Sequence, residues 1–219
     1  RDKLLASQKM NEGGVPIPTT AQVGTWQDTR RAVSRVGGTP CVIKTNEGTH
    51  GSGVFLAHTE QQARQLVYQM LERGLRPLVQ EYIRESHGQD IRAFVVGGKV
   101  VASMRRKAKG SEFRSNFHLG GEVEKLSITG EYAEIACKAA EILGLEIAGV
   151  DMLESERGPL VLEVNSSPGL EGIEAASGVN VANRIISNLA SLYKSRQEAE
   201  EKQLIPRCQG GDEEAKGKA

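Results

Sequence analysis

Two short apolar runs separated by a polar turn constrain the fold of this chain more than any other feature. The runs are residues 148–153 and 159–165, and the turn between them, residues 154–158, contains a glycine. Aliphatic and β-branched residues on both arms of a Gly-containing turn predict a β-hairpin. The rest of the chain is organised around this hairpin.

Three oxygen-bearing side chains lie within these apolar runs, namely Asp151, Glu163 and Asn165. Glu163 and Asn165 are two residues apart on one strand and therefore face the same side of the sheet, which Asp151 can reach from the partner strand. Such groups are costly to bury unless a cation satisfies them, and hard oxygen donors suit Mg²⁺. The alternative is that they cap strand ends and face water, which is favoured for Asp151 alone. The pattern E-x-N, followed at once by residues 166–169 (SSPG), favours a metal site.

A second hairpin is predicted where a buried strand, residues 40–44, ends in Lys44 and is followed by a glycine-rich loop and an apolar run at 54–57. The backbone N–H groups of such a loop can cradle phosphate oxygens, and a lysine at the strand end can meet the same phosphates. It is not a Walker A loop, because G-K-[ST] is absent. The alternative is a flexible hairpin tip. The glycines that would let the backbone approach a ligand are Gly48, Gly51 and Gly53.

Positive charge follows a third predicted hairpin, residues 90–96 and 99–107, which carries Arg92, Arg105 and Arg106; a solvated charged face is the alternative. Together the three hairpins suit phosphoryl transfer from a nucleotide, which needs charge neutralisation and placement more than covalent work by the protein. Two Mg²⁺ ions held by the oxygen donors could bridge the β- and γ-phosphates, with Glu163 the best candidate to bridge both ions. No Ser-His-Asp or Cys-His system is visible, so no covalent enzyme intermediate is expected.

Apolar periodicity and turn residues predict the remaining elements. Helices are expected at residues 1–12 without an N-cap, 25–36, 59–73 capped by Thr59, 129–143 capped by Thr129, and 181–193. A strand is expected at 77–83 and a loop at 169–178. Strand pairs that are hairpins, mixed irregularly with helices, predict an α+β fold with mainly antiparallel sheets.

Composition excludes some classes of protein. Acidic and basic residues balance at 28 each, so no overall charge draws the chain to nucleic acid or to a membrane. No apolar run is long enough to span a bilayer, and the three well-separated cysteines indicate a reduced, cytoplasmic protein. The first residue is Arg1, which suggests a piece of a longer protein. Residues 195–219 are charged and nearly free of aliphatic side chains, which predicts a disordered tail.

Several motifs appear in a characteristic order. They are R-D-K from residue 1, V-I-K-x-x-x-G-x-x-G-x-G-V from 42, V-Q-E-Y-I from 79, D-I-R from 90, F-R-S-N from 113, A-G-V-D from 148 and E-V-N-S-S-P-G-L-E-G-I from 163. In this order the chain resembles the ATP-grasp superfamily and, within it, the RimK-type α-L-glutamate ligases. The resemblance covers about residues 1–194, and its most specific part is residues 160–173.

The resemblance implies an ATP-grasp domain at 1–194, with a lid lobe at about 15–83 and a C-terminal lobe at about 84–194 that clasp ATP. In the family an N-terminal domain completes the substrate cleft, and from the resemblance we expect it to be absent from this chain. Residues implied to contact phosphates or the acceptor are Lys3, Lys44, Arg106, Arg114, Ser115 and Asn116, of which Arg106, Arg114 and Asn116 would be catalytic. Residues implied at the adenine and ribose are Gln80, Glu81, Tyr82, Ile83 and Asp90. Asp151, Glu163 and Asn165 would bind two Mg²⁺ or Mn²⁺ ions.

The implied reaction joins a carboxylate to the amine of L-glutamate with ATP, through an acyl phosphate. The resemblance implies the C-terminus of a small-subunit ribosomal protein as the acceptor, with a homo-oligomer left open. One alternative is a ligase that acts on a small-molecule acceptor, and another is a nucleotide-binding module or fragment without catalysis. A kinase is a third, but no H-R-D-type loop is present.

Overall fold

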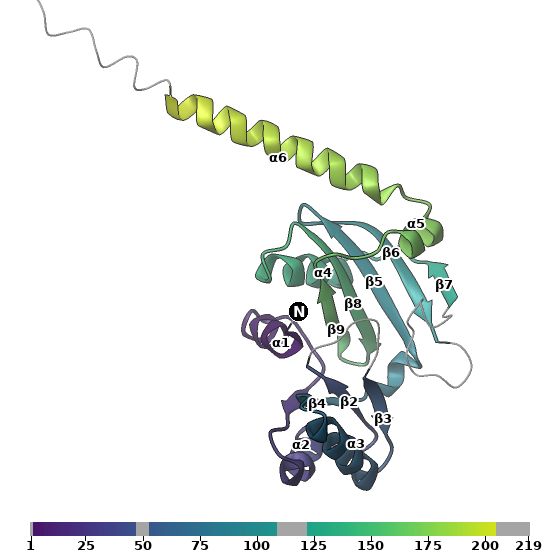
Figure 1. The fold of residues 1–219 in the computed structure, drawn as a ribbon. Coiled ribbons are helices and arrows are strands. Elements are labelled where there is room, and N and C mark those ends of the chain that lie inside the picture. Colours follow the sequence, from purple (N-terminus) through teal and green to yellow (C-terminus); the bar gives the residue numbers. More distant parts are fainter. Residues whose placement is uncertain (1, 47–52, 109–121, 205–219) are drawn as a thin grey trace, which may run out of the picture. The chain divides into compact units, whose positions relative to one another are not determined.

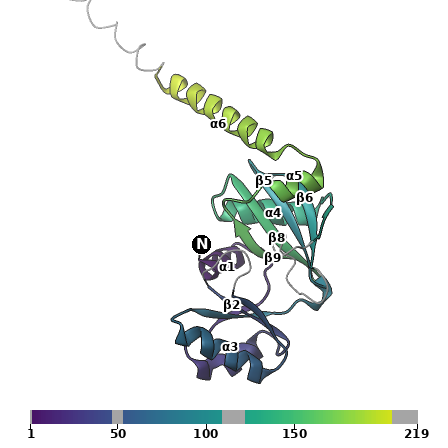
Figure 2. The same cartoon turned by 45° about the vertical axis from the view of Figure 1, so that its right-hand side comes forward.

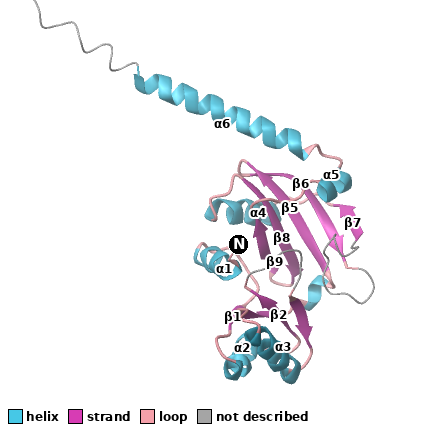
Figure 3. Ribbon diagram, viewed as in Figure 1, coloured by secondary structure: helices cyan, strands magenta, loops and turns pink. Residues whose placement is uncertain are grey.

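The computed structural model describes residues 2–46, 53–108 and 122–204. The chain divides into two units, Arg1–Val179 and Asn180–Ala219. The first unit contains two antiparallel sheets with their helices, and the second contains the long helix α6 (Figures 1 and 3). Among the described residues, no helix combines the length and the apolar character that a bilayer-spanning segment needs.

The smaller sheet has the strand order β1-β4-β2-β3, and its described strand pairs are antiparallel. Helices α2 and α3 pack against it (Figure 2). Its elements are β1 (Thr20–Gln22), η1 (Trp26–Asp28), α2 (Thr29–Arg35), β2 (Cys41–Thr45), β3 (Val54–Ala57), α3 (Glu60–Glu72) and β4 (Pro77–Glu81).

Helix α3 forms where the sequence predicts it, and its cap is confirmed. The hydroxyl of Thr59 accepts a hydrogen bond from the backbone N–H of Gln62, 3.2 Å away, and the Gln62 side chain accepts one from the N–H of His58. The first contact satisfies a donor that a helix N-terminus leaves without a partner, and the second ties Gln62 back to the residue before the cap. The apolar stripe of α3 is buried in the core against the small sheet and contains Ala63, Val67 and Met70.

The larger sheet has the order β7-β6-β5-β8-β9 and is likewise antiparallel in every described pair. Helix α4 packs on one face, and α5 contacts β6 and β7. Its elements are α1 (Lys3–Glu12), η2 (Arg84–Ser86), β5 (Gln89–Val96), β6 (Lys99–Lys107), β7 (Glu122–Lys125), α4 (Glu131–Ile142), β8 (Ile147–Ser155), β9 (Gly158–Asn165) and α5 (Glu171–Ser177). The expectation of an α+β fold with mainly antiparallel sheets is confirmed.

Alternation along β5 separates the two faces of this sheet. Ile91, Ala93 and Val95 are buried in a cluster with the alanines of α4. Because successive side chains of a strand point to opposite faces, Asp90 and Arg92 project away from α4. The face opposite α4 therefore carries the polar side chains of the candidate site.

Three local predictions about the first unit are wrong. Residues 169–178 are not a loop throughout, because Glu171–Ser177 form α5, in which Ile173 is buried and the Ser177 hydroxyl donates to the Ile173 carbonyl. Thr129 does not cap α4, since Gly130 occupies the N-cap position. The first helix does have a cap, because the Asp2 carboxylate accepts from the N–H of Leu5 at 2.9 Å.

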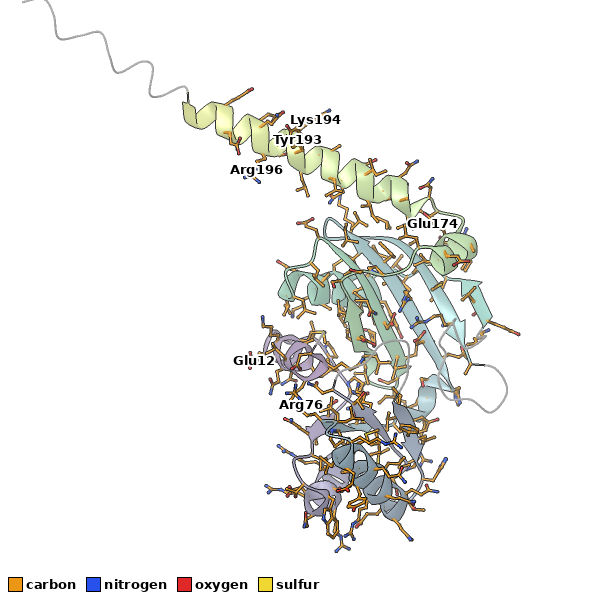
Figure 4. All side chains as sticks on the ribbon, viewed as in Figure 1. Glu12, Arg76, Glu174, Tyr193, Lys194 and Arg196 are labelled. Carbon is orange, nitrogen blue, oxygen red and sulfur yellow. The ribbon has the colours of Figure 1, made fainter. Side chains whose placement is uncertain are left out.

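The second unit contains α6, Val181–Leu204, which is longer than the predicted helix at 181–193. The first ten residues of the predicted disordered tail are therefore helical, and residues 205–219 lie outside the described residues. Good helix formers continue past Tyr193, which Figure 4 labels on α6 together with Lys194 and Arg196. Arg196 pairs with Glu200 one turn later at 3.1 Å, and Gln197 donates to the Tyr193 hydroxyl.

Candidate nucleotide and metal site

The three predicted metal ligands share one face of the β8–β9 hairpin. Asp151 lies directly opposite Glu163, and Gly149 lies directly opposite Asn165. Residues opposite each other across two strands project to the same face, so the Asp151, Glu163 and Asn165 side chains point the same way. The structure thus brings together the set that the sequence indicates.

A β-bulge produces this alignment. Met152 pairs with Val161 but Asp151 pairs with Glu163, so β9 contributes one extra residue, Leu162, at this point. Without the bulge, Asp151 would lie opposite Leu162, and Glu163 would face the core that contains Val161 and Met152. Bulges commonly re-aim side chains next to functional sites, and this one places two carboxylates side by side.

Two arginines hold the Asp151 carboxylate. Arg92 donates from Nε to Oδ1 and from Nη2 to Oδ2, both at 2.7 Å, and Nη2 of Arg106 lies 2.9 Å from Oδ2. The Asp151 side chain is 7% exposed. Burial raises the pKa of Asp151, but Arg106 and Arg92 outweigh it and lower that pKa to about 2. Asp151 is therefore a carboxylate at any physiological pH.

Arg106 links Asp151 to a second buried carboxylate. On the neighbouring strands Asp90 lies opposite Arg106, whose Nε donates to Oδ1 at 2.6 Å and whose Nη2 contacts Oδ2. Both side chains are 6% exposed. The resemblance implies roles for Asp90 at the ribose and for Arg106 near the γ-phosphate. In the structure both residues belong to one buried ion network, and those roles remain predictions.

Lysines from two other elements lie beside the acidic pair. Lys44, at the end of β2, donates to Gln80 Oε1 at 3.0 Å, and Gln80 in turn donates to the Thr20 hydroxyl. Lys3, in the first turn of α1, pairs with Glu163 Oε1 at 3.0 Å. Burial and the charge of Lys3 lower the pKa of Lys44, whereas the charge of Glu163 raises it, so these three charged groups influence one another.

Asn46 is a positioning residue that no sequence pattern indicated. It is 2% exposed; its side-chain oxygen accepts from the N–H of Leu4 at 2.9 Å, and its carbonyl accepts from the N–H of Lys3. These bonds fix the start of α1 against the end of β2 and so bring Lys3 near Lys44. An asparagine two residues after the lysine of a strand is too weak a pattern to identify this role from sequence.

The remaining predicted ligand residues are only partly covered by the structure. Gly48, Gly51 and the run Arg114, Ser115 and Asn116 lie outside the described residues. Gly53 is described, with a φ of +78° that favours glycine, and a Cβ there would lie 3.1 Å from the Thr45 hydroxyl.

The predicted adenine segment begins at a connection between the two sheets. Glu81 accepts from the Thr19 N–H at 3.1 Å and from Arg157, in the β8–β9 turn, at 2.8 Å. Ile83 is buried, whereas Tyr82 is half-buried. Contact of Glu81, Tyr82 and Ile83 with adenine stays a prediction.

The donor set fits a hard divalent cation. Asp151 and Glu163 supply carboxylate oxygens and Asn165 an amide oxygen, on one face and in register. Among residues 2–46, 53–108 and 122–204, no group of three or more His, Cys, Asp and Glu is arranged to hold a metal. A metal bound by this hairpin would therefore depend on the asparagine as well as on the two carboxylates.

We predict that ATP affinity falls as pH rises above about 8. Burial, and then the neighbouring Lys3, lower the pKa of Lys44 to about 8, while Glu163 acts in the opposite direction. Phosphates bound at Lys44 favour its charged form, so affinity should decrease above that pH by up to about tenfold per unit. Isothermal titration calorimetry from pH 7 to 10 measures this. In Lys44→Arg, which stays charged, the decrease should disappear; an equal slope in both proteins would contradict the prediction.

Above about pH 8, the effect of pH on folding stability through Lys44 has the opposite sign to its effect on ATP affinity. The folded-state pKa of about 8 lies below the ordinary 10.5, so the unfolded chain binds this proton more tightly. As far as Lys44 is concerned, the free energy of unfolding therefore increases with pH between these two values.

We predict that Gly149→Ala destabilises the hairpin and displaces the segment after Asn165. A Cβ at Gly149 would lie 2.7 Å from Pro168 Cβ, a distance that real Cβ atoms do not tolerate. Overpacking of this kind costs about 1–3 kcal/mol. Urea unfolding measures the loss, and Gly169→Ala is the matched control because a Cβ there meets nothing within 4 Å. Equal stability of the two variants would contradict this account.

The chain is similar to a known family and to named proteins. Residues 1–189 match the model of the RimK-like ATP-grasp domain. Over 189 residues the chain is 51% identical to a probable alpha-L-glutamate ligase from Aeromonas salmonicida, with 86% of this chain and 63% of that protein covered. It is 49% identical over 186 residues to one from Methanococcoides burtonii, with 85% and 62% covered. The chain thus spans less than two thirds of the length of these curated relatives.

Solved structures share the fold. The D-cycloserine synthetase DcsG has a TM-score of 0.71 at 19% identity, with 87% of this chain and 69% of that chain covered. The ATP-grasp ligase PsnB, complexed with a phosphomimetic variant of its minimal precursor, Mg and ADP, has a TM-score of 0.67 at 23% identity, with 87% and 58% covered. At these identities the likeness concerns the fold alone.

Proposed function

Because the chain belongs to the RimK-like ATP-grasp family, we propose that it carries the ATP- and metal-binding site of an ATP-dependent carboxylate–amine ligase that adds L-glutamate to an acceptor. The observation that carries this proposal is the shared face of Asp151, Glu163 and Asn165, with Lys3 at 3.0 Å from Glu163. In a complex of a nucleotide with metal ions, carboxylates can bind the metal ions and neighbouring lysines can bind the phosphates.

Asp151 and Glu163 would hold metal in different ways. Oδ2 of Asp151 already accepts from Arg92 and Arg106, whereas Oδ1 accepts from Arg92. A carboxylate oxygen has two lone pairs, so Oδ1 is the oxygen that keeps room for a metal. The Glu163 side chain is 40% exposed and uses Oε1 for Lys3, which makes it the candidate to bridge two Mg²⁺ or Mn²⁺ ions. Bound there, the ions would neutralise charge on the phosphates.

The proposed reaction has two steps. An oxygen of the acceptor carboxylate attacks the γ-phosphorus of ATP, the bond to the β–γ bridging oxygen breaks, and ADP leaves with that electron pair. The amine of glutamate then attacks the acyl carbon, the carbon–oxygen bond to phosphate breaks, and inorganic phosphate leaves as the amine releases a proton. Lys3 and Lys44 would bind and orient the phosphates, and Arg114 and Asn116 are proposed at the acceptor and γ-phosphate.

We further propose a ribosomal protein C-terminus as the acceptor, supported by the resemblance to RimK-type ligases. Mass spectrometry tests it with the chain, ATP, Mg²⁺, glutamate and either a small-subunit ribosomal protein or small carboxylic acids. Addition of glutamyl residues to the ribosomal protein alone would support the assignment, and addition only to a small acid would replace it. ATP binding with no amide product and no ADP release would instead indicate a non-catalytic nucleotide-binding module.

A further inference from the structure

Cationic side chains already engage the acidic face of the β8–β9 hairpin. Arg92, Asp151 and Glu163 lie directly opposite one another on β5, β8 and β9, and Lys3 extends this row beyond Glu163. Across the described site, the carboxylates Asp90, Asp151 and Glu163 are outnumbered by the cations Lys3, Lys44, Arg92 and Arg106. The described part of the site therefore carries no excess of negative charge that would attract a bare cation.

A divalent ion entering alone would have to compete with these groups. It would approach Asp151 against the guanidinium of Arg92, 2.7 Å from each carboxylate oxygen, and Glu163 against the ammonium of Lys3. Repulsion between like charges is strong at such distances where the groups are largely buried. A polyphosphate brings the negative charge that offsets these cations, so metal and nucleotide together meet no such opposition.

Arg92 is better suited than Arg106 to act as the competitor. Arg106 is 6% exposed and is tied to Asp90 as well as to Asp151, so it has no room to withdraw. The Arg92 side chain is 18% exposed, and Asp151 is the carboxylate that it binds through both oxygens. If Arg92 withdraws, Asp151 still has a partner in Arg106.

We propose that Arg92 is a specificity-determining residue that keeps Asp151 from binding a free divalent cation, so that the site accepts metal only together with a polyphosphate nucleotide. The proposal rests on the proposed function, because it assigns the same residues to metal and nucleotide. It extends that function by stating which form of the metal the site binds.

The test uses Mn²⁺ as the probe and electron paramagnetic resonance to count free and bound ion, with and without ADP. The wild-type chain should bind Mn²⁺ weakly alone and much more tightly with ADP. Arg92→Met should raise the affinity for Mn²⁺ alone by about tenfold or more, because one competing charge is removed, and should change binding with ADP much less. Arg92→Lys should behave like the wild type, and Asp151→Asn added to Arg92→Met should abolish the gain.

The other outcomes are equally informative. If Arg92→Met weakens Mn²⁺ binding in both conditions, Arg92 merely supports Asp151, and the proposal is overturned. Unchanged binding of Mn²⁺ alone in a folded Arg92→Met protein would also overturn it, as would wild-type binding that is equally tight with and without ADP; neither touches the proposed function. If the wild type binds no Mn²⁺ even with ADP, the proposed function fails together with this inference.

Discussion

Replacing Glu163 with glutamine is expected to lower the rate of ATP-dependent ligation about 10²–10³-fold while leaving the fold intact. Glutamine keeps the shape but removes the charge from the side chain that lies opposite Asp151 and is proposed to bridge two ions. Interactions that stabilise charge in the transition state have effects of this size. Coupled release of ADP, measured with glutamate and an acceptor present, gives the rate.

The matched control for this variant lies on the same hairpin. Glu154 pairs with Arg105 at 2.8 Å and its side chain is 40% exposed, as is that of Glu163, which pairs with Lys3 at 3.0 Å. Glu154→Gln should therefore lose a comparable exposed ion pair and retain activity. Equal rates for Glu163→Gln and the wild type would remove Glu163 from the metal site. If Glu163→Gln binds ATP normally and the wild type makes no product, the chain is a binding module.

Replacing Arg106 with methionine is expected to lower the free energy of unfolding by about 3–5 kcal/mol. Asp90 would lose its charged partner and Asp151 one of two, and both carboxylates are at least nine-tenths buried. Removing one member of a buried ion pair is this costly because it leaves an uncompensated charge out of water. Urea unfolding followed by circular dichroism measures the change as a shift in midpoint at constant slope.

Two further variants separate lost charge from lost packing. Arg105 is adjacent to Arg106 but projects to the other face of the sheet, where it forms partly exposed ion pairs with Glu124 and Glu154. Arg105→Met should therefore lower the free energy of unfolding by at most about 1 kcal/mol. Adding Asp90→Asn to Arg106→Met removes the stranded carboxylate and should restore part of the stability. If the double variant is no more stable than Arg106→Met, the loss comes from packing, and the electrostatic account is wrong.

Local signals allowed much of the fold to be predicted. The Thr59 cap and the apolar stripe of α3 act within one helix turn or two, so the helix forms as the pattern indicates. The strand Lys99–Lys107 and the turn before it also match the prediction, since a two-glycine turn between apolar runs directs the chain back on itself. One error falls where a glycine interrupts a pattern, at α5, where Gly172 disguises a short helix.

In the candidate site too, local patterns identified residues, whereas tertiary contacts determined how they meet. Asp151, Glu163 and Asn165 could be selected from the sequence because a run of oxygen donors inside apolar strands is a local pattern. Their common face depends on the bulge at Leu162, and the partners of Asp151 depend on strand pairing. Arg92 and Asp151 are 59 residues apart in the chain, and no local pattern relates them.

By itself, the sequence therefore determined the residue types, the periodicity of each segment and the chemistry available on each hairpin, because these depend on neighbours within a few residues. Only the tertiary structure decided which charges meet. Arg92 and Arg106 reach Asp151, and Lys3 reaches Glu163, because strand register and the Asn46 contacts with α1 bring distant segments together. Register is a property of hydrogen bonding between strands, so a shift of one residue would turn the same side chains to the opposite face.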